Sequence, residues 1–328
     1  MTKPVRWGIL GASNFALHRM APAIHAASGA QFAALATSDP AKAIPFQDFC
    51  PDLKVHSSYE ALLADPMIEA VYIPLPNHLH VDWTLKAIEA GKHVLVEKPL
   101  AMKATEFDAV IAKRDETGLT VAEAFMIVHH PQWIRARELV QSGAVGRVEH
   151  LDVAFSYDNR GEPENIRNRP ETGGGSIPDI GVYAYGCARF VMGAEPLDLQ
   201  ARIRWENGVD VWTQVTGKMA GPMGEFTYSG LTSMRLFPRQ EVVIQGETGM
   251  IRLTAPFNAD VFSEATVELH RMGFVSTYER FPQARQYQIQ AENFGRTVRT
   301  GAAYPCPLEF SRGTQAMIDQ VLAVATEV

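Results

Sequence analysis

The sequence predicts an α/β protein in which a doubly wound parallel sheet is followed by an α+β domain with a large, open, mostly antiparallel sheet. Three observations lead to this class. Short apolar runs alternate with amphipathic stretches over residues 1–124, as in strand–helix–strand units. Longer segments with a period of two residues fill much of residues 125–328. At 328 residues the chain is longer than one hydrophobic core usually organises, so we expect two domains with these bounds.

The predicted strands of the first domain are four apolar runs bounded by turn residues. They are residues 5–10, 31–37, 70–75 and 93–98. Because these runs are apolar throughout, we expect a parallel sheet that is buried on both faces. The stretch before the last run has helical spacing and ends at Gly91, where a helix end favours a left-handed residue. Pro22 predicts an interruption of the first helix, because proline lacks the N–H that a helix interior needs.

The second domain begins with one helical stretch and continues as strands. Residues 131–143 have helical periodicity, and alternating segments follow as far as residue 271. An Asn-Gly pair at 207–208 predicts a tight hairpin between two of these segments. A last helix over residues 308–327 closes the chain. A broad sheet with one apolar face left to cover predicts a homodimer or homotetramer.

Composition excludes several classes of partner. The chain has 30 basic and 37 acidic residues, a net charge of −7, which argues against nucleic acid or an anionic membrane as the main partner. The three cysteines are scattered, and the histidine pairs at 78/80 and 129/130 lack a third ligand at useful spacing, so we expect no metal. No signal peptide or transmembrane run is evident. We therefore expect a cytoplasmic protein.

A turn that contains glycine follows the first predicted strand. A dinucleotide-binding Rossmann fold needs glycine in this turn, a small residue where the backbone meets the pyrophosphate, and another where helix meets strand. Gly11 fits the first role and Ala16 the third, while Ser13 stands at the second. The alternative is a tight turn without special function. The predicted cofactor contacts of the turn are Gly11, Ala12, Ser13, Asn14 and Phe15.

The end of the second strand bears on the choice between NAD and NADP. An acidic residue there would bind the ribose 2′-hydroxyl of NAD and repel a 2′-phosphate. The strand ends instead in Thr37 and Ser38, whose hydroxyls can donate to a phosphate, and the first acid, Asp39, follows later. We therefore expect NADP as the preferred cofactor and NAD as the alternative, although no arginine stands here to clamp the phosphate.

Polar residues stand at the ends of the third and fourth strands, where an open parallel sheet binds its ligands. Lys98 directly follows a buried strand, and Pro99 restricts its backbone. A lysine held there can bind a substrate hydroxyl and stabilise the alkoxide that develops as hydride leaves. The alternative is a strand that simply exits into solvent. The predicted cofactor contacts at these strand ends are Leu75, Pro76, Asn77, His80, Glu97 and Lys98.

The second domain supplies partners for Lys98 in residues 173–193. This segment opens with three glycines, and Asp179 and Tyr183 stand four residues apart, on one face of a predicted helix. Asp179 can orient a group or accept a proton, and Tyr183 can donate or accept one. Without Lys98, an ordinary helix acid and a half-buried tyrosine would be the better interpretations. We predict that Lys98, Asp179 and Tyr183 are catalytic and also bind the substrate. Arg167 is a further candidate for substrate binding, although an ordinary surface arginine explains it about as well.

Together these segments resemble the Gfo/Idh/MocA family, the relatives of glucose–fructose oxidoreductase and inositol dehydrogenase. The resemblance covers essentially the whole chain, and the combination of EKP with GGGxxxDIGxY is specific. The matching segments are RWGILGASNFA, VYIPLPNHLH, VLVEKPLA, AEAFMIVHHPQ, NIRNRPETGGGSIPDIGVY and QGETGMIRL.

The resemblance implies roles for particular residues. Lys98 matches the family's catalytic lysine, whose bond to the following proline is often cis, and Asp179 matches the aspartate of the second motif. Tyr183 stands where many members carry histidine. Tyrosine at this position resembles the branch of glucose–fructose oxidoreductase, trans-dihydrodiol dehydrogenase and certain xylose dehydrogenases, most of which use NADP. The chain departs from that branch at Ser38, where arginine is usual, and at residues 127–128, where Ile-Val replaces a Tyr-Arg pair that faces the site. A more apolar pocket is therefore expected.

The resulting hypothesis is an NADP-linked oxidoreductase that acts on a hydroxyl or carbonyl of a sugar, cyclic polyol or vicinal diol. Two alternatives stay open. Some relatives hydrolyse glycosides through transient oxidation by bound NAD, and a non-catalytic protein that senses NADP would keep the same fold. The acid–base residues Lys98, Asp179 and Tyr183 argue against a sensor, because a sensor does not need them.

Overall fold

The computed structural model describes residues 3–259 and 261–328, which form two compact units. The first unit is Met1–Met126 with Arg285–Ser311, and the second is Ile127–Ala284 with Arg312–Val328. The first break lies two residues after the predicted one at 124/125. The return of Arg285–Ser311 to the first unit was not predicted, because the pattern along the chain gives no sign of which core a late helix joins.

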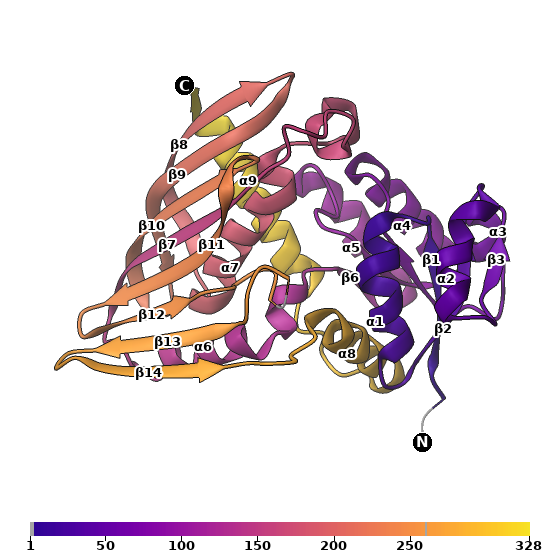
Figure 1. Cartoon of the computed structure of the whole chain (residues 1–328), viewed down its shortest axis with the longest axis horizontal. Helices are drawn as coiled ribbons and strands as arrows, with labels where there is room; N and C mark the ends of the chain where they lie inside the picture. The colour runs from indigo at the N-terminus through magenta and orange to yellow at the C-terminus, as the bar shows by residue number, and fades with distance from the viewer. Residues whose placement is uncertain (1–2, 260) are drawn as a thin grey trace. The chain divides into compact units, whose positions relative to one another are not determined.

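The first unit is built on a six-stranded parallel sheet in the order β3-β2-β1-β4-β5-β6 (Figure 1). Its strands are β1 (Val5–Leu10), β2 (Ala30–Ala36), β3 (Lys54–His56), β4 (Ala70–Ile73), β5 (His93–Val96) and β6 (Val121–Glu123). The four predicted strands are present. The strands β3 and β6 were missed because each has three residues, which is too short to show a periodicity. The order reverses between β1 and β4, which is the switch point where folds of this kind bind dinucleotides.

Helices cover both faces of this sheet. They are α1 (Ala21–Ala26), α2 (Ile44–Phe49), α3 (Tyr59–Leu63), α4 (His80–Glu89), α5 (Phe107–Thr117) and α8 (Gln286–Thr300). On one face, Trp7 of β1 packs on Phe294 of α8, with ring centroids 5.0 Å apart. On the other, Val94 of β5 shares a core with Phe107 of α5. The interruption predicted at Pro22 is present: a π-helical turn ends one residue before α1, whose second residue is this proline.

The second unit contains a nine-stranded sheet in the order β14-β13-β12-β11-β7-β10-β9-β8-β15 (Figure 1). It is antiparallel except where β7 pairs with β10 and β8 with β15. Asn207 and Gly208 both have positive φ in the hairpin between β8 and β9, as the Asn-Gly pair predicted. The strands are β7 (Val148–Asp158), β8 (Glu195–Glu206), β9 (Val209–Gly221), β10 (Gly224–Ser233), β11 (Arg235–Gly246), β12 (Gly249–Leu253), β13 (Thr266–Arg271), β14 (Val275–Arg280) and β15 (Ala325–Glu327).

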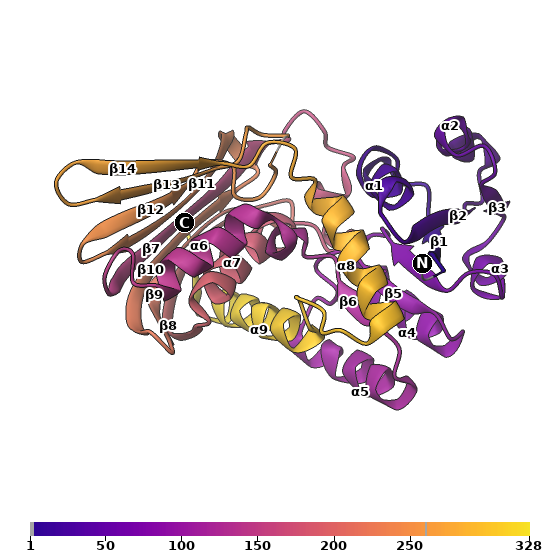
Figure 2. The same ribbon diagram turned by 90° about the horizontal axis from the view of Figure 1, so that it is seen from below.

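Three helices lie along one face of this sheet: α6 (Pro131–Gln141), α7 (Val182–Met192) and α9 (Leu308–Val324) (Figure 2). Within the second unit, Arg189 of α7 donates to Thr314 of α9 over 2.7 Å. On the opposite face, Arg252 of β12 pairs across the strands with both Glu241 of β11 and Glu268 of β13. The oligomeric state stays a prediction.

Candidate active site

The turn after β1 has the backbone of a dinucleotide-binding site. Gly11 has a φ of +106°, which favours glycine, and its N–H donates to the carbonyl of Ala36 over 3.0 Å. A Cβ on Gly11 would lie 3.1 Å from Leu75 Cδ2, so a side chain here would crowd the end of β4. Ser13 Oγ accepts from the N–H of Ala16 at the start of the helical segment. The turn thus keeps open backbone at the switch point, which fits a dinucleotide pyrophosphate.

At the end of β2, the acid that follows the strand is engaged locally. Asp39 Oδ1 accepts from the N–H of Ala41 over 3.0 Å and caps a short helical turn. The hydroxyl of Thr37 donates to the carbonyl of Asp39 and accepts from its N–H. Of the two predicted phosphate contacts, Ser38 is the exposed one, whereas Thr37 is buried and serves the turn. Without an acid aimed at the ribose, this strand end suits a 2′-phosphate.

Lys98 follows β5 within electrostatic reach of the carboxylates of Glu97 and Glu123, and the Lys98–Pro99 bond is cis, as the resemblance implied. Glu97 accepts from the hydroxyl of Tyr72 over 2.6 Å, and Glu123 accepts from the backbone N–H of Leu100 over 2.8 Å. Burial raises the pKa of both carboxylates, and the charge of Lys98 opposes that rise in both. The lysine therefore lies near a half-buried acid, Glu97, and a buried acid, Glu123, at the carboxyl edge of the sheet.

His80 positions the loops that end β4 and β5. Its ring is fully buried, with Nδ1 2.8 Å from the carbonyl of Pro99 and Nε2 2.7 Å from the carbonyl of Leu75. Burial lowers the pKa of His80 to about 4. The sequence predicted His80 as a cofactor contact, which stays a prediction; the structure shows that its side chain binds both loops, while Pro76 and Asn77 are partly exposed.

In the second unit, Asp179 accepts two strong bonds on one oxygen. Asp179 lies in a π-helical turn (Ile177–Gly181) before α7, and its Oδ2 lies 2.8 Å from Nε of Arg167. The hydroxyl of Tyr157 donates to the same Oδ2 over 2.6 Å. The charge of Asp179 is the main cause that raises the pKa of Arg167. Arg167, whose role the sequence left open, is thus an ion-pair partner of the predicted catalytic aspartate.

Tyr157 was not predicted, although a signal for it exists. It belongs to β7, in which Leu151, Val153 and Phe155 alternate as buried residues. Continuing that period of two places Tyr157 on the same face of the sheet. Burial first, and then the charge of Asp179, raises its pKa, so the hydroxyl stays protonated and donates.

The glycine run before Asp179 allows two close backbone approaches. The N–H of Gly175 donates to the carbonyl of Arg167 over 2.9 Å, and a Cβ on Gly174 would lie 2.5 Å from that carbonyl oxygen. Gly175 has a φ of +127°, and a Cβ on it would collide with Asp210. Asp210, also missed from the sequence, accepts from Ser176 Oγ and from the N–H of Ile177, and burial raises its pKa to about 7.

Tyr183, near the start of α7, is held by aromatic rings. Its ring centroid lies 6.0 Å from that of Phe155 and 5.8 Å from that of Phe257, and these two rings stack on each other. Tyr183 also lies within electrostatic reach of Arg167. Ile127 and Val128, which replace the Tyr-Arg pair of the related branch, are both buried.

The histidine pair before α6 has a structural role. His129 and His130 are buried, and Nδ1 of His130 accepts from the N–H of Gln132 at the start of the helix. Within residues 3–259 and 261–328, no group of three or more His, Cys, Asp or Glu side chains is arranged to hold a metal. No helix in those ranges is long and apolar enough to cross a membrane.

Comparisons with known proteins agree with the geometry of both units. Residues 5–125 match the model of an oxidoreductase family with an NAD-binding Rossmann fold, and residues 133–252 match the GFO/IDH/MocA C-terminal domain. The chain is 35% identical to D-xylose 1-dehydrogenase (NADP(+)) 2 of Haloferax volcanii, over 96% of this chain and 95% of the relative. It is 32% identical to dTDP-3,4-didehydro-2,6-dideoxy-α-D-glucose 3-reductase of Saccharopolyspora spinosa, over 99% and 96%.

A solved structure is similar over its whole length. The 3-ketoreductase of Actinomadura kijaniata, crystallised with NADP and TDP-benzene, has a TM-score of 0.87 and 26% identity, with 99% of each chain covered. The family models account for most of the chain, and the curated relatives cover nearly all of it. The chain belongs to the Gfo/Idh/MocA family of oxidoreductases.

Proposed function

We propose that the protein is an NADP-linked oxidoreductase that moves a hydride between the nicotinamide and a hydroxyl or carbonyl of a sugar, cyclic polyol or vicinal diol. One observation carries the proposal. Lys98 follows β5 at the carboxyl edge of the parallel sheet, the same edge at which the open turn of Gly11 follows β1. A cation held there stabilises a developing alkoxide where the fold binds its dinucleotide.

The proposed roles divide the proton transfer among three residues. Lys98 and Tyr183 take up the proton of the reacting hydroxyl during oxidation and return it during reduction, and Asp179 orients these two residues. Asp179 performs this role while fixed by Arg167 and Tyr157 through the bonds to its Oδ2. The bound nicotinamide supplies the hydride acceptor or donor.

The preference for NADP is supported by the end of β2. Asp39 is turned to its own helical turn, and Ser38 is exposed. The Haloferax relative is named for NADP(+), and the Actinomadura structure contains NADP. NAD is the less favoured cofactor because no acid is placed for the 2′-hydroxyl.

We further propose that the substrate is an uncharged sugar or polyol. The loop over residues 158–172 carries three arginines and four acidic residues. Each arginine is ion-paired: Arg160 with Asp158, Arg167 with Asp179, and Arg169 with Glu171. Arginine binds a phosphate through the same charge-assisted bonds, and in this loop those bonds already go to carboxylates. This favours a xylose-like substrate over the dTDP-linked sugar of the Saccharopolyspora reductase.

The first experiment titrates the protein with NADPH and NADH while nicotinamide fluorescence is followed, and then screens aldoses, polyols and a dTDP-sugar for turnover. We expect tighter NADPH binding and turnover of an uncharged substrate. Tighter NADH binding would overturn the cofactor proposal, and turnover of the dTDP-sugar alone would overturn the substrate class. Glycoside cleavage without net reduction would instead support the hydrolase, and cofactor binding without turnover of any substrate would support a sensor.

We also propose a cytoplasmic homodimer or homotetramer. The three cysteines, Cys50, Cys187 and Cys306, are buried and form no disulfide, which suits a reducing compartment. Light scattering at several concentrations tests the assembly, and a monomer throughout would refute it.

A further inference from the structure

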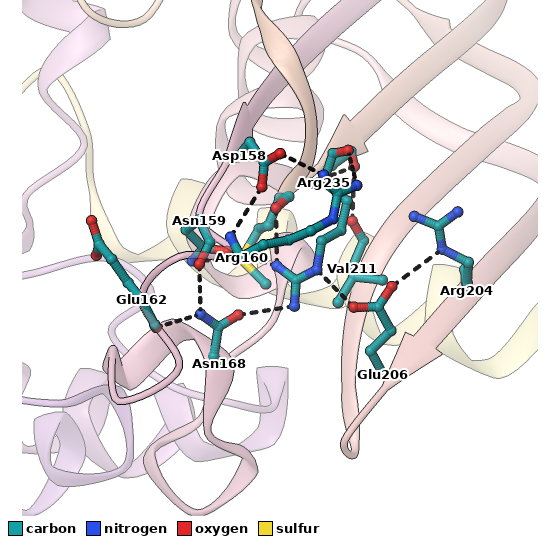
Figure 3. Close-up of polar contacts among 11 residues, drawn as sticks. Asp158, Asn159, Arg160, Glu162, Asn168, Arg204, Glu206, Val211 and Arg235 are labelled. Carbon is teal, nitrogen blue, oxygen red and sulfur yellow. Dashed lines mark hydrogen bonds and ion pairs between the residues drawn. The ribbon is translucent and has the colours of Figure 1, made fainter.

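A buried arginine at the start of β11 connects three segments of the second unit (Figure 3). Arg235 Nη1 donates to Asn159 Oδ1 over 2.7 Å, Nη2 donates to Asn168 Oδ1 over 3.2 Å, and Nε donates to Glu206 Oε2 over 2.7 Å. The residue is 7% exposed. A buried guanidinium is tolerated only when it is paired and hydrogen-bonded, and here its planar fork is used on three sides.

The two asparagines are neighbours of the residues that bind Asp179. Asn159 follows Tyr157 by two positions, and Asn168 directly follows Arg167. Asn168 Nδ2 also donates to the carbonyl of Asn159 over 3.3 Å, which ties the two ends of the loop to each other.

The backbone around the arginine strengthens this arrangement. The carbonyl of Arg235 accepts from Nη2 of Arg160 over 2.5 Å, and the backbone N–H of Arg235 donates to Ser233 Oγ over 3.0 Å. In the ladder between β7 and β11, Arg235 is the partner of Asp158, the residue after Tyr157. One side chain therefore fixes the strand end that presents Tyr157 and the loop that presents Arg167.

We propose that Arg235 is a positioning residue that holds Tyr157 and Arg167 in register on Asp179. This inference rests on the proposed function, since it assigns a role to a residue behind the proposed site. Arg235 acts through Tyr157 and Arg167, which both donate to Asp179. A lysine at this position would carry the charge but could not reach both asparagines and Glu206 with one ammonium group.

Limited digestion with trypsin tests the positioning without any substrate. Trypsin can cleave after Arg160 and Arg167 in the loop, whereas the bond after Arg169 is protected by Pro170. We expect Arg235→Met to speed cleavage at the first two sites at least tenfold, with NADPH binding unchanged. Arg239→Met is the matched control, because Arg239 stands on the same strand, is exposed and pairs only with Glu241 among the described residues.

Kinetics test whether the positioning serves the reaction. We expect Arg235→Met to lower kcat about 10²-fold with little change in the NADPH dissociation constant, because a displaced catalytic group costs about that factor. In an Arg167→Ala background, the same substitution should lower kcat much less, since both act on one unit. Additive losses would indicate a general structural role and would overturn the inference.

A milder variant guards against misfolding of Arg235→Met. Asn168→Ala removes one link from the partly exposed loop, and we expect faster cleavage after Arg160, a bond that the substitution does not alter, and a lower kcat. If the loop of both variants is cut at the wild-type rate, the inference is wrong whatever the enzyme's activity. If wild type turns over no sugar but the loop of either variant loosens, the proposed function fails while the positioning by Arg235 is supported.

Discussion

The hydroxyl of Tyr157 offers the sharpest test of the site in the second unit. Tyr157→Phe removes an O–H donor that lies 2.6 Å from Asp179 and leaves the ring in place. Hydrogen bonds to charged groups contribute about 1.5–3 kcal/mol. We expect a loss of this size in the free energy of unfolding, and about a 10- to 100-fold loss of kcat/KM if the bond also orients Asp179 during the reaction.

The matched control is Tyr185→Phe. Tyr185 is a buried tyrosine of α7 whose hydroxyl has no hydrogen-bond partner in the part of the chain that the structure describes. Removing that hydroxyl should not lower the unfolding free energy and should raise it by about 1 kcal/mol, because no bond is lost and a buried hydroxyl without a partner carries a desolvation cost. Urea unfolding and steady-state kinetics on both variants supply the comparison. Equal losses in the two variants, or a Tyr157→Phe protein as stable and active as wild type, would refute the role of this bond.

Three further predictions concern separate parts of the chain. Lys98→Ala should bind NADPH normally but lose turnover by about 10²-fold or more. The control Lys103→Ala, which changes an exposed lysine, should keep both NADPH binding and turnover. Near-normal activity of Lys98→Ala would remove Lys98 from the mechanism. Burial raises the pKa of Asp210 to about 7, so the folded state holds a proton that the unfolded state releases, and the unfolding free energy falls as pH rises from about 4 to 7. In urea unfolding at several pH values, Asp210→Asn should lack this fall. An unchanged dependence of the unfolding free energy on pH would contradict the prediction. Gly175→Ala should lower the unfolding free energy by about 1–3 kcal/mol for its backbone conformation alone. The loss should be larger because the new Cβ meets Asp210, so a wild-type urea midpoint would disprove the close approach.

The first unit could be predicted from sequence because its signals are local. Four apolar runs correctly predicted four of its strands. The turn after β1, the end of β2 and Lys98 after β5 were expected at one edge of the sheet, because the carboxyl ends of parallel strands lie at the same edge. The helix α8 could not be assigned to this unit from sequence. Its amphipathic face fits any core, and contacts such as that of Phe294 with Trp7 show which core it joins.

The supporting residues of the second unit have a common reason for being missed. Asp179 belongs to a recognisable motif, but its partner Tyr157 lies 22 residues away on β7, and Asp210 meets Ser176 from 34 residues away on β9. Such contacts depend on which strands pair, and the spatial order β11-β7-β10-β9 does not follow the chain. Composition and periodicity predict that strands exist but not their neighbours.

Register therefore defines this half of the site as much as the motif does. Arg235 faces Asp158 in the β7–β11 ladder, which sets where Tyr157 stands relative to Asp179. A slip of one residue in β7 would turn Tyr157 to the other face of the sheet, since side chains alternate with a period of two. The segment from Gly173 to Tyr183 would be unchanged by that slip, yet Asp179 would lose the hydrogen bond from Tyr157. A protein that keeps the motif but pairs these strands differently would thus lack the arrangement proposed here.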